Sequence, residues 1–273
     1  MKRKIKTMDM VTSTSKSSLK FILLVFLLSI PIWLISSLLG NKLPIPINLP
    51  ISALLFLIPV TAASILLYGQ YGLNSIKDLL KKTLDYKKIK NKIWYLPALL
   101  LVPLIYFLSY AIMRLAGLPL PQLITTPFLM TPIFFMAFFI GAACEELGWS
   151  GYAIDSMQNQ WGALKSGIIL GLVWQTWHII GYLQAQNTAA WIVWHSLYSV
   201  GLRILIVWVY NNTQKSVFAA ILVHTVDNVS WSLFPIYGSH FDPFIAFIIM
   251  TIVVTIVIIL WGHKTLAQYR YFH

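Results

Sequence analysis

Two adjacent glutamates and two histidines are the residues of this sequence best suited to chemistry. Glu145 and Glu146 are the only glutamates among 273 residues, and they follow the apolar run FFMAFFIGAAC. An ionised carboxylate within a bilayer is costly, so such residues usually serve a function. His178 and His224 lie in two later apolar stretches. We therefore predict one ionisable cluster inside a membrane.

These side chains supply the parts needed for hydrolysis. A carboxylate can take a proton from water, an imidazole can hold that water or protonate a leaving amine, and an amide can stabilise an oxyanion. Asn228 follows His224 by four residues, so the two share one helix face. Glu145, His178 and His224 could alternatively bind zinc and leave a position open for water. Spacing alone leaves both chemistries open.

The composition excludes a soluble domain. Hydrophobic residues make up 58% of the chain and charged residues only 10%, with a mean hydropathy of +0.75, whereas soluble domains carry about 25% charged residues. The net charge of +12 comes largely from lysines in the first 20 residues and in residues 77–92. We interpret these as cytoplasmic segments near anionic lipid head groups, not as a nucleic-acid site. The expected partners are membrane lipids and a peptide or protein substrate.

The elements that position the cluster should be transmembrane helices, because the apolar runs are continuous and about 20 residues long. We predict an all-α, polytopic helical bundle of about eight transmembrane helices with both termini cytoplasmic. Residues 1–18 are predicted to be a basic disordered tail, and residues 19–273 a single membrane domain. The predicted helices are 19–39, 51–68, 93–115, 127–149, 163–183, 189–210, 217–236 and 243–261.

This topology predicts the depth of the cluster. Glu145 and Glu146 fall near the cytoplasmic end of the helix expected at 127–149, with the histidines nearer mid-bilayer. The expected cavity therefore opens to the cytoplasm or laterally to lipid.

Neighbouring residues receive weaker assignments. Arg203 is expected simply to reach the nearest membrane interface, and His195 to make a structural hydrogen bond. Candidates for lining the pocket or supporting the cluster are Trp149, Tyr152, Trp174 and Asp227.

Three short motifs occur in a fixed order along residues 134–231: Glu145-Glu146 followed by Gly151-Tyr152, then Trp174-xxx-His178, then His224-xxx-Asn228. This arrangement resembles the CPBP family of intramembrane endopeptidases, which includes type 2 CAAX prenyl proteases and bacterial Abi or immunity proteins. The family pattern is Glu-Glu-xxx-Arg, aromatic-xxx-His and His-xxx-Asn/Asp. The resemblance implies that residues 134–231 form the catalytic core.

The resemblance also implies individual roles. Glu145 would be the general base that activates water, with His178 helping to position it and Glu146 as a supporting carboxylate. His224 and Asn228 would stabilise the oxyanion. The family is usually treated as independent of metal, so no cofactor is expected, with zinc on Glu145, His178 and His224 as the alternative.

One position departs from the family pattern. Ser150 stands where the family has arginine, and serine can hydrogen-bond to a carboxylate but cannot neutralise it. This departure puts catalytic competence in doubt unless another cation substitutes.

We predict a multi-pass protein of the cell membrane, of bacterial type, that cleaves a membrane-associated peptide or protein in peptide maturation or bacteriocin self-immunity. A non-catalytic immunity or scaffold protein that uses the same pocket is the alternative favoured by Ser150. A proton-coupled transporter is a third hypothesis, disfavoured because no inverted repeat is visible.

Overall fold

The computed structural model describes residues 15–39, 51–121 and 128–267, and within these ranges it contains helices and loops but no strand. The predicted all-α bundle is confirmed. Its α-helices are α1 (Ser15–Leu39), α2 (Leu57–Tyr71), α3 (Leu73–Lys81), α4 (Val102–Leu115), α5 (Thr131–Gly148), α6 (Ile154–Trp161), α7 (Ala163–Gln184), α8 (Ala189–Asn212), α9 (Val217–Leu233) and α10 (Pro243–Trp261).

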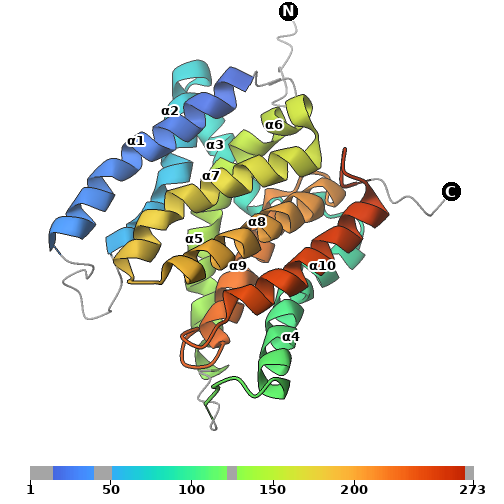
Figure 1. The fold of residues 1–273 in the computed structure, drawn as a ribbon. Coiled ribbons are helices and arrows are strands. Elements are labelled where there is room, and N and C mark those ends of the chain that lie inside the picture. The colour runs from blue at the N-terminus through green and yellow to red at the C-terminus, as the bar shows by residue number, and fades with distance from the viewer. Residues whose placement is uncertain (1–14, 40–50, 122–127, 268–273) are drawn as a thin grey trace, which may run out of the picture.

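The helices that carry the predicted cluster are neighbours in the bundle. α5 packs along α9, α9 along α8, and α8 along α7 (Figure 1). Glu145 and Glu146 on α5, His178 on α7 and His224 on α9 therefore come from adjoining elements. The packing of these four helices brings together chain segments about 80 residues apart.

The outer surface of the bundle is apolar, as a membrane requires. Leu27, Phe107 and Ile252 are 61%, 65% and 56% exposed on α1, α4 and α10. In water such a surface would be a strong aggregation site, whereas in a bilayer it faces acyl chains.

Six helical segments of the described chain are long and apolar enough to cross a membrane, fewer than the eight expected. α7 is not among them, and α9 is apolar but has only 17 residues. Both helices hold polar residues of the cluster, which explains why they depart most from an ordinary lipid-spanning composition.

The helical run that carries the glutamates is longer than predicted. α5 continues through a π-helical turn at Trp149–Ala153 into α6, so the run extends over 31 residues from Thr131 to Trp161. Glu145 lies near the middle of this run, although the α-helix that holds both glutamates ends at Gly148, close to the predicted end at residue 149. Such π-helical turns are frequent at functional sites.

The N-terminal helix begins earlier than predicted. α1 starts at Ser15, so residues 15–18 are helical and do not belong to a disordered tail. Residues 1–14, and the predicted outward loops at 43–50 and 122–126, lie outside the described residues. The single membrane domain stays a prediction.

Gly148 lets α5 approach α2 closely, two residues after Glu146. A Cβ at this position would lie 2.6 Å from Cβ and 2.7 Å from the carbonyl carbon of Pro59. Gly141, two turns earlier on α5, has nothing within 4 Å of the equivalent position. The two glycines on one helix thus differ sharply in their surroundings.

We expect Gly148→Ala to destabilise the protein by about 1–3 kcal/mol, because the added methyl group forces backbone to shift. Gly141→Ala is the matched control, and it should be neutral or stabilising by up to about 1 kcal/mol because alanine favours helix. Thermal unfolding in detergent would measure both. Equal stability of the two variants would contradict this account of the α2–α5 contact.

Candidate active site

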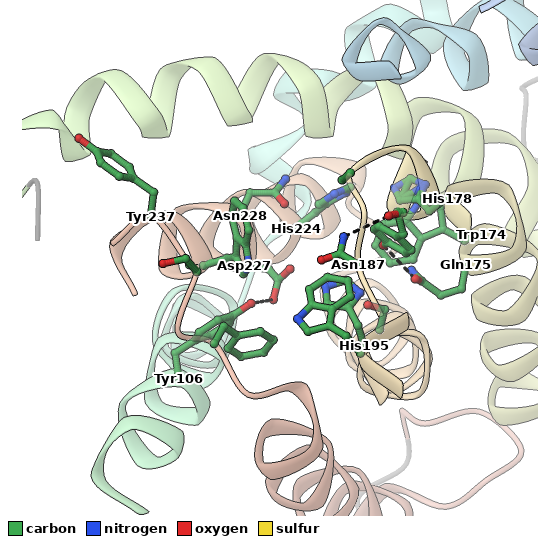
Figure 2. A pocket seen from close by; sticks show the side chains of 18 of the residues that line it. Tyr106, Trp174, Gln175, His178, Asn187, His195, His224, Asp227, Asn228 and Tyr237 are labelled. Carbon is green, nitrogen blue, oxygen red and sulfur yellow. Dashed lines mark hydrogen bonds between the residues drawn. The ribbon is translucent and has the colours of Figure 1, made fainter. Parts of the chain in front are cut away.

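The predicted cluster lines a cavity of about 630 Å³ (Figure 2). Its walls come from α4, α5, α7, α8, α9 and the segment between α9 and α10. The cavity reaches the loop after α7 at Asn187 and the segment after α9 at Ser239. The predicted site residues among its lining are Glu145, Trp174, His178, His224, Asp227 and Asn228.

The two adjacent glutamates have different surroundings. Glu145 lines the cavity and is 8% exposed, whereas Glu146 is fully buried. Oε2 of Glu145 accepts a hydrogen bond of 2.8 Å from Nε1 of Trp174. Among the described residues, Oε1 of Glu145 accepts none, so this oxygen is available to water or substrate.

Glu146 is held by three partners away from the cavity. Oε1 lies 3.0 Å from Nδ1 of His224, and Oε2 accepts hydrogen bonds from Ser150 and, at 2.8 Å, from Nη1 of Arg203. A buried carboxylate needs this kind of pairing, because the desolvation penalty is otherwise large. The contact with Nδ1 also orients the imidazole ring of His224, which leaves Nε2 for the cavity.

Arg203 supplies the cation that Ser150 cannot. The prediction that Arg203 reaches the membrane interface is wrong, since its side chain is fully buried and paired with Glu146. Its guanidinium carbon also lies 4.4 Å from the ring centroid of Trp174. Trp174 therefore connects the two glutamates, as it donates to Glu145 and contacts the arginine that binds Glu146.

His178 and Asn228 complete the side of the cavity nearest the glutamates. His178 packs against Trp174 and Trp177, with ring centroids 5.4 and 4.7 Å apart. Asn228 lies one turn from His224 on α9 and lines the same space, as Figure 2 shows. Asn228 is thus placed on the same helix as His224, as the spacing predicted.

Two of the weaker candidates lie elsewhere. Trp149 is fully buried and packs against Phe21 and Trp177, with centroids 5.3 and 5.8 Å apart. Tyr152 contacts Phe21 at 5.3 Å. Neither lines the cavity, because the π-helical turn that carries both residues directs them toward α1.

Several cavity residues were missed because they belong to no recognisable motif. Tyr182 and Gln175 on α7 line the cavity and are joined by a hydrogen bond of 3.1 Å. His195 on α8 stacks on Trp191, and its Nδ1 is buried without a hydrogen-bond partner, contrary to the structural bond expected. Arg203, which is buried outside the cavity lining, carried a signal in the sequence, since a single charge within an apolar helix is unusual.

The residues of the alternative zinc set lie around one cavity. Across residues 15–39, 51–121 and 128–267, no three side chains of His, Cys, Asp or Glu are grouped as metal ligands. Nδ1 of His224 is held by Glu146, so Nε2 is the ring nitrogen left for the cavity. Carboxylates hold metal-binding histidines in the same way, so this contact is compatible with either chemistry.

The resemblance expected from the motifs is supported by two comparisons. Residues 125–230 match the family model described as "Type II CAAX prenyl endopeptidase Rce1-like". This segment resembles the family so described. It contains every residue of the three motifs, so the resemblance to the CPBP endopeptidases is confirmed.

A curated relative agrees with this assignment. The "CAAX prenyl protease 2" of Methanococcus maripaludis is 30% identical over 114 residues, which cover 38% of this chain and 41% of the relative. The chain thus matches less than half of the relative's length. The likeness therefore concerns the segment that carries the three motifs.

We expect Arg203→Ser to destabilise the protein strongly, by about 3–5 kcal/mol, because Glu146 would stay buried without its cation. The swap variant Arg203→Ser with Ser150→Arg should recover part of that loss, since Ser150 already contacts Glu146. Arg114→Ser, which removes an exposed arginine, is the control. Thermal unfolding in detergent measures all three.

A swap variant no more stable than Arg203→Ser would contradict the equivalence of the two positions. Unchanged stability of Arg203→Ser alone would show that the Glu146 carboxylate needs no cation.

Proposed function

We propose that this protein is an intramembrane endopeptidase in which Glu145 activates water to hydrolyse a peptide bond. The observation that carries the proposal is that the two glutamates have different hydrogen-bond partners and different exposure to the cavity. Glu146 is buried and occupied by Arg203, Ser150 and His224, whereas Glu145 faces the cavity with one oxygen unoccupied. One carboxylate is structural, and the other is available for proton transfer.

The proposed reaction uses groups already in the cavity. Glu145 takes a proton from water, and the resulting hydroxide attacks the carbonyl carbon of the peptide bond. Asn228, through its side-chain amide, and His224, through the ring nitrogen not held by Glu146, stabilise the oxyanion. Glu145 then returns the proton to the leaving nitrogen as the C–N bond breaks. The products are a carboxylate and an amine.

The supporting residues fix the geometry of these steps. Trp174 holds Glu145 by its indole N–H at 2.8 Å, and Glu146 orients His224 at 3.0 Å. A carboxylate behind an imidazole also balances the positive charge formed whenever the ring takes up a proton. His178 lies against Trp174 at the cavity wall, where it can help to position the water.

The arrangement around Glu146 weakens the case for a non-catalytic scaffold. Ser150 was the feature that favoured this alternative, because the family arginine is missing there. Arg203 provides the missing charge from α8, so the departure at Ser150 no longer implies a defective site.

We place the protein in a bacterial plasma membrane, where it would act in peptide maturation or self-immunity.

Glu145→Gln should reduce cleavage by about 100-fold or more, because glutamine cannot accept the proton from water. The assay would use purified protein in liposomes that contain a mixture of synthetic single-span peptides, with products read by mass spectrometry. Cys144→Ser is the matched control, as Cys144 is adjacent in sequence and absent from the cavity lining.

Cleavage retained in Glu145→Gln would refute the proposed role of this carboxylate. Repeating the assay with EDTA distinguishes a metal-free mechanism from a zinc-dependent one. Cleavage should persist in EDTA, and a loss of cleavage that zinc alone restores would mean a metal mechanism instead.

A further inference from the structure

The basic loops of this protein gather at one end of the bundle. They are tied together by direct contacts: Nζ of Lys88 donates to the carbonyl of Lys215 at 3.2 Å, Nζ of Lys82 to that of Gly151 at 2.8 Å, and the amide of Ala163 to the carbonyl of Lys264 at 2.7 Å. The segment from Lys77 to Lys92 and the starts of α7 and α9 therefore form a single basic end.

The cavity opens toward the opposite end. Its outermost lining comes from the end of α7 and the segments that follow α7 and α9, at Ala185, Asn187 and residues 237–239. In Figure 1 these segments lie toward the lower left, whereas α3 and α6 lie at the top. Arg114, at the end of α4, is a basic residue of the cavity end, whereas the lysines of the loops named above lie at the basic end.

The charge asymmetry assigns a side of the membrane to each end. Lys and Arg in short loops are retained in the cytoplasm. By this rule the basic end is cytoplasmic and the cavity mouth is not, which differs from the cytoplasmic or lateral opening expected from the sequence. We propose that the site takes its substrate from the extracytoplasmic side of the membrane, as a peptide segment entering between the α7–α8 and α9–α10 loops. The nature of the substrate in this proposal rests on the proposed function. The side of the membrane from which it enters rests only on the distribution of charge.

Thiol labelling in intact cells tests the side directly. In a Cys144→Ser background, Ser239→Cys places a thiol at the exposed cavity mouth and Lys90→Cys places one at the exposed basic end. A membrane-impermeant maleimide should label Ser239→Cys in intact cells, and Lys90→Cys only after permeabilisation. The reverse pattern would overturn the proposal.

Labelling does not require catalysis, so the test is independent of the enzymatic proposal. The same pair of cysteines in a Glu145→Gln background should label identically. Failure of the labelling pattern would refute the side of entry, whereas failure of the cleavage assay would refute the endopeptidase.

A second feature of the cavity, the charge of its lining, bears on which peptide substrates it can bind. Between the glutamates and the mouth, Asp227 lines the cavity and accepts hydrogen bonds on Oδ1 from Tyr198 at 2.7 Å and from Tyr106 at 3.3 Å. Figure 2 shows Asp227 beside Tyr106 within the cavity. The described lining contains carboxylates at Glu145 and Asp227 but no lysine or arginine.

An unpartnered buried amide in the same cavity also indicates a ligand. Gln175 is 2% exposed, and its Nε2 has no hydrogen-bond partner while Oε1 accepts from Tyr182. Whichever way the amide is turned, one of its polar atoms is left without a partner, which is costly unless a ligand binds it. A peptide carbonyl or amide of the substrate would satisfy this atom.

We infer that Asp227 is a specificity-determining residue that binds a basic side chain of the substrate, with Gln175 binding the peptide backbone. The second oxygen of Asp227 is the acceptor left for that cation, because both tyrosines donate to Oδ1. A lining with carboxylates and no cation disfavours an acidic residue or a free C-terminal carboxylate at this position.

Single-span synthetic peptides in liposomes, identical except for Lys, Gln or Glu at each position near the cleaved bond, test this inference. Wild type should prefer Lys at one position, and Asp227→Asn should raise KM for that peptide about tenfold or more with little change in kcat. The Gln and Glu peptides should be affected much less. Asp78→Asn, an exposed carboxylate at the basic end, is the control.

A uniform loss across all peptides in Asp227→Asn would mean a structural role and overturn the inference. So would a wild-type enzyme that prefers Glu, or that does not distinguish the three peptides.

Discussion

The buried ion pair between Glu146 and Arg203 is the interaction on which the site depends. Both side chains are fully buried, and a carboxylate in such a place is tolerated only when its charge is matched and its oxygens are bonded. The pair fixes α5 against α8, and the second oxygen of Glu146 fixes His224 on α9. One charged group therefore sets the relative positions of three helices in an environment where lipid offers no hydrophobic force between them.

The partners of Glu146 also determine the surroundings of Glu145. Because Arg203, Ser150 and His224 all bind Glu146, its neighbour Glu145 is held only by Trp174 and faces the cavity. Trp174 is also the residue that contacts Arg203, at 4.4 Å. The ion pair and Glu145 are thus connected through one indole ring, so a shift of α8 would displace the oxygens of both glutamates.

The sequence predicted the members of this site better than their arrangement. Glu145, His178, His224 and Asn228 could be identified because polar groups are rare in apolar helices and because the motifs occur in order. Arg203 could not be assigned, since its partner lies 57 residues away and only helix packing brings them together. The same packing explains why α7 and α9 are not among the long apolar segments, because they pair their polar residues with one another and with α5 inside the bundle.

The length of the helical run that carries the glutamates was underestimated for a related reason. A helix end was expected after Trp149, where polar residues begin, whereas a π-helical turn carries the chain onward into α6. This continuation places Glu145 near the middle of a 31-residue run. A carboxylate at that depth can be reached by water only through a cavity, and the cavity lies between the ends of α7 and α9 that face away from the lysines. The π-helical turn thus carries the helix past the glutamates into α6, although the residues around it read from sequence as an ordinary helix end.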